Sequence, residues 1–304
     1  MSVPTRIWST DVVVLTRSAT ERTLDGDGGA RRFWDFPAAS GAAELPPLFL
    51  VHGFRGDHHG LLRIIEALPG YRVIVPDLPG FGQSDPFSGK HDVAAYASFV
   101  RDSVSRLALG PETVLVGHSF GSIIAGRAAA DAPDAFAALV LINPISAPAL
   151  EGSSRLATRL AELYYRLGAA LPERAGQALL SNRIIVRAMS ELMAKTRDRQ
   201  LRRWIHAQHR AYFSAFASRD VVLQAFTASI SSTVRDSASR LQLPVLLIAA
   251  EKDDLGTVET QQELAALIPN ATLVVLPDVG HLVHYEAPDA AAAHIADFVE
   301  ARTR

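Results

Sequence analysis

The residues of this chain best suited to chemistry lie in the pentapeptide Gly117-His118-Ser119-Phe120-Gly121. It follows an apolar run, Thr113–Val116, that predicts a buried strand, and it precedes Ser122–Ala125, which predicts the start of a helix. A serine between two glycines in such a strand–turn–helix can expose its hydroxyl at the tip of a sheet, where it could act as a nucleophile. Because the chain holds 20 glycines, the pentapeptide alone is a weak signal, and the inference depends on this context.

An acidic residue and a histidine follow this serine, each at the end of another apolar run. Asp253 comes after Val245–Ala250, and His281 comes after Leu273–Leu276. A serine hydroxyl is a poor nucleophile unless a histidine removes its proton during attack, and a carboxylate can orient that histidine. The order serine, acid, histidine is typical of such a set on a parallel α/β sheet.

The elements that must hold these residues are short, continuous apolar runs, which are typical of strands buried on both faces of a sheet. Helical patterns such as Val93–Leu107 and Val258–Ile268 separate most of them, and this alternation predicts an α/β fold with helices on both faces of a mostly parallel sheet. Turn residues at Asp25–Gly29 predict an early hairpin between Val12–Leu15 and Arg31–Phe36. The predicted core strands are Leu48–Val51, Val73–Val75, Val114–Val116, Leu139–Ile142, Val245–Ile248 and Leu273–Leu276.

One interval, residues 145–241, contains no convincing strand and is helical in pattern, for example over Asn182–Lys195 and Arg197–Ala217. No linker rich in proline, glycine or serine brackets it, which favours an inserted helical cap over an independent second domain. The predicted domains are a core of residues 1–144 and 242–304 and a cap, or lid, of residues 145–241. A leucine stripe at spacings of three and four marks its first helix: Leu156, Leu160, Leu163, Leu167 and Leu171.

Three further segments carry a family resemblance. They are His52-Gly53-Phe54, Asp77-Leu78-Pro79-Gly80-Phe81-Gly82-Gln83-Ser84, and the pattern Gly-His-x-x-x-x-Glu-x-Pro from Gly280 to Pro288. With the pentapeptide, and in this order, they make the chain resemble the α/β-hydrolase fold family, especially its capped esterase-like members. The resemblance covers most of the chain outside residues 145–241, where only the helical character matches.

The resemblance implies a role for each matching residue. Ser119 would be the nucleophile, His281 the general base and Asp253 its orienting acid. The oxyanion hole would be the backbone N–H groups of Phe54 and Phe120, and each such donor is typically worth about 3 kcal/mol to the tetrahedral intermediate.

The chain departs from the family pattern at three positions. Asp254 stands beside Asp253, and the family spacing Gly-x-x-Asp selects Asp253 by aligning Ala250 with the glycine. Asn143 occupies the other strand end sometimes used for the acid, and it cannot carry the charge. Ser122 stands where many relatives have another glycine, and we expect little consequence there.

Several other polar residues could carry chemistry, but each has a simpler interpretation. His58 with His59, and His206 with His209, lack a further ligand at metal spacing, so we predict surface or pocket residues and no metal. Gly80-Phe81-Gly82 lacks the helix start of a dinucleotide loop, so no cofactor is predicted. Packing or structural roles are favoured for His118 and His284, although both could line a pocket. A solvated helix face, rather than an anion site, is favoured for Arg197, Arg199, Arg202, Arg203 and Arg210.

Composition restricts the class of protein further. The formal net charge of −2 argues against a general nucleic-acid binder, and the absence of cysteine excludes disulfides and thiolate chemistry. The N-terminus has no signal-peptide pattern, and no apolar stretch approaches the 18 residues of a membrane span. We therefore expect a cytoplasmic protein with a small-molecule substrate.

The function that these residues predict is a cofactor-independent serine hydrolase, a carboxylesterase working through an acyl-enzyme. The same set of residues could instead act on a lactone, a thioester, a C–C bond or in perhydrolysis, and some relatives are non-catalytic receptors. Leu282 follows His281 where C–C hydrolases often carry tryptophan, which lowers that alternative. Aromatic residues of the cap suggest an apolar pocket for an acyl or alcohol group. The predicted lining residues are His118, Leu282, Tyr164 and Trp204.

Overall fold

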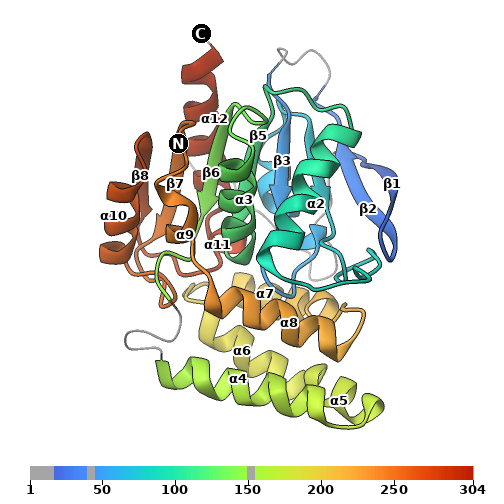
Figure 1. Ribbon diagram of the computed structural model, residues 1–304. Helices are drawn as coiled ribbons and strands as arrows, with labels where there is room; N and C mark the ends of the chain where they lie inside the picture. The colour runs from blue at the N-terminus through green and yellow to red at the C-terminus, as the bar shows by residue number, and fades with distance from the viewer. Residues whose placement is uncertain (1–16, 40–44, 149–154, 304) are drawn as a thin grey trace.

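The computed structural model describes residues 17–39, 45–148 and 155–303 (Figure 1). Their centre is one eight-stranded sheet with the order β1-β2-β4-β3-β5-β6-β7-β8. The first two strands form an antiparallel hairpin, β2 pairs antiparallel with β4, and all remaining neighbours are parallel. The strands are β1 (Thr20–Gly26), β2 (Gly29–Phe36), β3 (Leu48–Val51), β4 (Val73–Pro76), β5 (Val114–His118), β6 (Ala138–Ile142), β7 (Val245–Ala250) and β8 (Ala271–Leu276).

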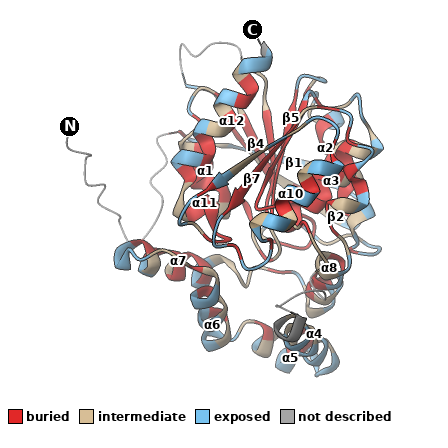
Figure 2. Cartoon of the chain, turned by 90° about the vertical axis from the view of Figure 1, so that its left-hand side faces the viewer, coloured by how far each residue is buried: buried red, intermediate tan, exposed pale blue. Residues whose placement is uncertain are grey.

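Helices cover both faces of the sheet, as Figure 2 shows nearly edge-on. One face carries the short 3₁₀ turn η1 (His58–Leu61) with α1 (Leu62–Glu66), α11 (Val283–Glu286) and α12 (Pro288–Thr303). The other carries α2 (Val93–Arg106), α3 (Phe120–Asp131), α9 (Arg235–Ala238) and α10 (Val258–Leu267). The predicted α/β architecture is therefore confirmed.

Each central strand supplies side chains to both apolar layers, because successive side chains of a strand point to opposite faces. In β5, Leu115 packs with the α2–α3 layer, whereas Val114 and Val116 pack with the α1–α12 layer. This two-sided burial explains why the central strands are continuous apolar runs. The edge strand β8 differs from the prediction, since only Leu276 is fully buried there.

The predicted hairpin is present, but its first strand is Thr20–Gly26. The run Val12–Leu15, which the sequence suggested for that strand, lies outside the described residues. The predicted helices Val93–Leu107 and Val258–Ile268 correspond closely to α2 and α10.

Five helices between β6 and β7 form a separate layer beyond the carboxyl edge of the sheet (Figure 1). We call α4 to α8 the helical layer. Helices α7 and α8 lie next to the sheet, and α4, α5 and α6 lie farther out in both views (Figures 1 and 2). Four leucines of the predicted stripe, Leu160, Leu163, Leu167 and Leu171, are exposed to solvent, and the side chain of Leu156 lies outside the described part. The five helices are α4 (Arg155–Ala170), α5 (Glu173–Leu180), α6 (Arg183–Met193), α7 (Arg199–Tyr212) and α8 (Arg219–Ser231).

Candidate active site

Ser119 occupies the sharp turn between β5 and α3. Its backbone has φ 53° and ψ −120°, a region that L-residues rarely adopt and that costs of order 1 to 3 kcal/mol. The flanking glycines provide space for this turn. A Cβ on Gly117 would lie 2.4 Å from the carbonyl oxygen of Gly121, and one on Gly121 would lie 2.2 Å from that of Val51. The two glycines are therefore required by close backbone approach.

Ser122 has a larger structural role than the sequence suggested. Its Oγ donates a hydrogen bond to the carbonyl oxygen of Ser119 at 2.5 Å and accepts one from the N–H of Ile145 at 3.2 Å. The side chain thus ties the turn to the segment that leaves β6, which a glycine could not do.

The three residues predicted as a catalytic set are joined by hydrogen bonds. His281 Nε2 lies 2.8 Å from Ser119 Oγ, and His281 Nδ1 lies 2.8 Å from Asp253 Oδ2. Asp253 and His281 are both buried. The neighbouring carboxylate of Asp254 is instead exposed and pairs with Lys195. The geometry therefore brings Asp253, and not Asp254, to the imidazole.

Two further donors hold the Asp253 carboxylate. Its Oδ1 accepts the N–H of Leu255 at 2.9 Å, and its Oδ2 accepts the side-chain amide of Asn143 at 2.8 Å. Burial alone would raise the pKa of Asp253, but the charge and hydrogen bond of His281, with these donors, lower it overall. An ionised Asp253 requires the hydrogen on His281 Nδ1, which leaves Nε2 free to accept the Ser119 proton.

The backbone N–H groups of Phe54 and Phe120, both near Ser119, have no acceptor among the described residues. Phe120 is the first residue of α3, where N–H groups have no partner within the helix. Phe54 belongs to the loop of residues 52–57 that follows β3. His52 orders this loop, because its Nε2 accepts the N–H of Leu78 at 2.9 Å and its Nδ1 contacts the carbonyl oxygen of Gly53 at 2.8 Å.

The buried carboxylate of Asp77 organises the same region from the end of β4. Its Oδ1 accepts both the N–H and the Nδ1–H of His58, and its Oδ2 accepts the N–H of Gln83. The segment Asp77–Ser84 that carried the family resemblance therefore supports the 52–57 loop and its neighbour η1.

A small cavity of about 60 Å³ lies between the sheet edge and the helical layer, with Ser119 and His281 in its wall. His118 and Leu282, two of the predicted pocket residues, also line it. Tyr164 and Trp204 lie elsewhere. The hydroxyl of Tyr164 donates to the carbonyl oxygen of Leu179, and the indole of Trp204 packs edge-on against Tyr285. The other lining side chains are mixed in polarity and include Arg55, Met193, Gln208, His209, Tyr212, Phe213, His284 and Tyr285.

Three of the histidines around this cavity, His118, His209 and His284, are neutral near pH 7. Burial lowers the pKa of both His118 and His209 to about 3, and it lowers that of His284 well below its usual value. His118 Nε2 lies 3.1 Å from His284 Nδ1 and 3.3 Å from the carbonyl oxygen of His281. These rings therefore pack as polar but uncharged groups behind His281.

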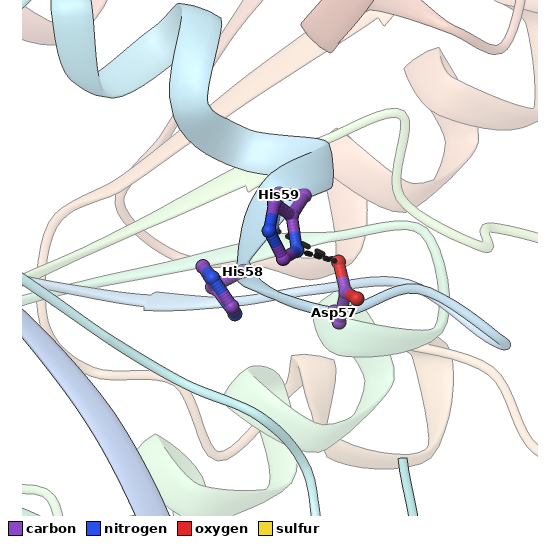
Figure 3. A group of neighbouring side chains, drawn as sticks. All are labelled: Asp57, His58 and His59. Atoms are coloured by element: carbon purple, nitrogen blue, oxygen red, sulfur yellow. Dashed lines mark hydrogen bonds and ion pairs between the residues drawn. The ribbon is translucent and has the colours of Figure 1, made fainter. Parts of the chain in front are cut away.

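The histidine pairs considered as metal ligands have other partners. Asp57, His58 and His59 bring three ligand atoms within 4.8 Å of one another (Figure 3). His59 Nδ1 lies 3.1 Å from Asp57 Oδ1, whereas His58 Nδ1 is already bonded to Asp77 at 2.9 Å. His206 and His209 both place Nδ1 within 2.7 Å of Ser190 Oγ, which accounts for that pair without a metal.

Arg55 connects the 52–57 loop to the helical layer, and nothing in the sequence pattern indicated it. Its buried guanidinium donates to the carbonyl oxygens of Phe213 and Leu180, at 3.0 and 2.8 Å, and to the hydroxyl of Tyr165 at 3.3 Å. It has no carboxylate partner among the described residues. A stack of rings makes a second connection, since His59 lies face to face with Tyr212 at 3.8 Å between centroids.

Comparison with known proteins identifies the class of this chain. The sequence model of the alpha/beta hydrolase fold matches residues 46–288, and the chain belongs to that family. It is 26% identical over 251 residues to Lipase 3 of Moraxella sp. (strain TA144), which covers 79% of this chain and 73% of that relative. It is 30% identical over 267 residues to the magnesium-chelatase 30 kDa subunit of Rhodobacter capsulatus, covering 86% and 89%.

Solved structures agree on the fold. A thermophilic esterase from Thermogutta terrifontis superposes with a TM-score of 0.72 over 93% of this chain and 98% of that one, at 24% identity. In the part of the chain that the structure describes, none of the helices has the length and apolar character to cross a bilayer.

Proposed function

We propose that this protein is a cofactor-independent serine hydrolase that cleaves carboxylic esters of small molecules. The observation that carries this proposal is the continuous chain of hydrogen bonds from Ser119 Oγ through His281 to Asp253. The unpaired N–H groups of Phe54 and Phe120 support it, and so do relatives whose names are lipase and esterase.

In the proposed reaction, Ser119 Oγ attacks the carbonyl carbon of the ester while His281 Nε2 takes the hydroxyl proton. The oxyanion accepts hydrogen bonds from the N–H groups of Phe54 and Phe120. Collapse of the tetrahedral intermediate expels the alcohol, which receives the proton from His281, and leaves an acyl-enzyme on Ser119. Water, deprotonated by His281, then attacks this acyl group, and release of the acid restores the serine.

The cavity supports a preference for short acyl groups. Its volume is about 60 Å³, whereas cavities that hold benzene measure about 150 Å³. Within the predicted cap of residues 145–241, we take the helical layer as the roof of this cavity, whereas α9 of the same interval packs on the core of residues 1–144 and 242–304. The lining of the cavity is mainly apolar, in line with the apolar acyl or alcohol group that the sequence suggested, and Arg55 and Gln208 add polar groups to it.

A turnover series on p-nitrophenyl esters of rising acyl length tests this function. We expect the highest kcat/KM with acetate or butyrate and a fall of at least about tenfold at octanoate, because longer chains exceed the cavity. Replacing Ser119 with alanine should lower kcat by about a thousandfold or more.

A fluorophosphonate probe provides the control. It should label the native chain and fail to label the Ser119→Ala variant. Full turnover by that variant would contradict the mechanism. Labelling of Ser119 without turnover of any ester would point to another bond, such as a thioester or lactone, or to a non-catalytic receptor.

A further inference from the structure

Strongly exposed apolar side chains concentrate on the outer side of the helical layer. Among the described residues, nine large hydrophobic side chains are prominently exposed, and six of them belong to α4, α6 or the turn after α4. The fractional exposure reaches 80% at Ile184 and 74% at Leu192. Four of the six follow one another along α4 and the turn after it, and we call these four the docking face: Leu160, Leu163, Leu167 and Leu171.

The exposed leucines of α4 are not its packing face. At spacings of three and four they share one side of the helix, whereas Tyr165 and Gly168, on another side, are buried. Gly168 lies so close to Leu180 that an added Cβ would meet that side chain at 2.6 Å. Helix α4 therefore already packs against α5, and its leucine side is a second apolar surface that the described part of the chain leaves uncovered. Contiguous surfaces of this kind mark sites of interaction.

Charge identifies the kind of partner. Residues 155–212 hold twelve basic and four acidic side chains, a formal charge of +8, whereas the rest of the chain holds eighteen basic and twenty-eight acidic, a formal charge of −10. The modest net charge of the whole chain therefore conceals a strongly basic helical layer on an acidic core.

Some of this positive charge lies beside the leucines. Arg159 and Arg166 each directly precede a leucine of the stripe and are exposed. Arg159, Arg174 and Arg183 have no carboxylate partner among the described residues, and Arg166 pairs with Glu162 within its own helix. Apolar side chains next to unpaired arginines are the composition of a helix that lies in the interface of an anionic membrane.

We propose that the docking face binds the surface of an anionic lipid bilayer. The four leucines enter the boundary between headgroups and acyl chains, while the arginines contact lipid phosphates. A second copy of this chain fits less well, because a symmetric dimer through this face would bring two basic surfaces together. Docking would turn the helical layer, and the cavity behind it, toward the membrane. The proposal does not depend on which bond Ser119 attacks.

Co-sedimentation with vesicles tests the proposal. The full chain should bind vesicles of phosphatidylcholine mixed with phosphatidylglycerol and bind pure phosphatidylcholine about tenfold or more weakly, because the basic layer needs anionic headgroups. Added salt should release it. The double variant Leu163→Asp with Leu167→Asp should lose about tenfold or more in vesicle binding, because charged side chains replace the apolar contacts.

Leu267→Asp is the matched control. Leu267 is 48% exposed on α10 of the core, close to the 50% of Leu167, so the same change is made at a similar surface. It should leave vesicle binding unchanged, and every variant should keep its turnover of a soluble short ester. Equal loss in the control, or equal binding to both kinds of vesicle, would overturn the proposal. So would a native dimer that binds no vesicles and dissociates in the double variant.

Discussion

The carboxyl edge of the sheet and the helical layer beyond it hold their functional side chains in different ways. Ser119, Asp253 and His281 follow β5, β7 and β8, and Phe54 follows β3. These strands are parallel and lie in one part of the sheet, so their ends meet at the same edge. Each position there is fixed by strand pairing and by short hydrogen bonds to neighbouring loops.

The helical layer reaches the 52–57 loop and its neighbour η1 through a few side chains instead. Arg55 bonds to α5 and to the segment after α7, and the ring of His59 stacks on Tyr212. The carboxylate of Glu286 accepts the N–H groups of Lys195 and Thr196 as well as that of Gly280, beside His281. We therefore propose that the sheet edge determines the chemistry and that the helical layer controls access to it. We expect substitutions at the sheet edge to abolish activity and substitutions in the helical layer to reduce it only in part.

The largest difference is expected between two adjacent carboxylates. Asp253→Asn should lower kcat by about a thousand- to ten-thousandfold, because an amide favours the wrong tautomer of His281 and cannot stabilise its charge. Asp254→Asn should change kcat less than about twofold, because that side chain forms only an exposed ion pair with Lys195. Steady-state kinetics on a short ester measures both. Similar losses of kcat in the two variants would contradict the assignment of the buried Asp253, rather than the exposed Asp254, as the acid that orients His281.

The sheet edge was the more predictable region. Apolar runs gave β3 exactly as it occurs, and the other core strands within about two residues at either end, because strands buried on both faces leave a continuous signal. The order of Ser119, Asp253 and His281 followed from the strand ends that carry them. Asn143 was considered only as a missing acid, and its amide bond to Asp253 needed the positions of two strands that are distant in sequence.

The helical layer was less predictable, for a physical reason. A helical stripe of leucines shows that one side is apolar but not what that side meets, so the outward direction of the α4 leucines could not be inferred. Aromatic residues indicate packing equally in any direction, and Tyr164 and Trp204 pack within the molecule rather than at the cavity. Arg55 follows Phe54 in an unremarkable loop, and only the tertiary structure shows its partners.

A smaller effect is expected at the connection between the two regions. Arg55→Gln should lower kcat/KM by about ten- to a hundredfold, because the carbonyl oxygens of Phe213 and Leu180 lose their donor at about 1 to 3 kcal/mol each and the loop carrying Phe54 is released. Arg101→Gln provides the control. This change removes an ion pair with Asp131 at the surface, and Asp131 still pairs with Arg127 and Arg240. It should therefore change kcat/KM less than about twofold. Unaltered kinetics for Arg55→Gln would mean that the loop holds its shape without the layer.

The last effect concerns stability and not activity, and it tests whether the two regions unfold together. His118 at the sheet edge and His209 in the layer both have a pKa lowered by burial from 6.5 to about 3. Between about pH 3 and pH 6.5, each of these imidazoles is protonated in the unfolded chain but stays neutral in the folded chain. The contribution of each histidine to the free energy of unfolding is therefore complete above about pH 6.5. It declines by about 1.4 kcal/mol per pH unit as the pH falls toward 3.

Replacing either residue, as His118→Asn or His209→Asn, should make the free energy of unfolding depend less steeply on pH. The slope should fall by the contribution of that one histidine, about 1.4 kcal/mol per pH unit. Urea unfolding followed at several pH values between 4 and 7 measures the slope, and far-UV circular dichroism with tryptophan fluorescence checks that the transition is single. Equal flattening by both variants in one shared transition is expected if the layer and the sheet form one cooperative unit. If His209→Asn affects only an earlier, separate transition, the helical layer opens independently of the strands that carry Ser119 and His281.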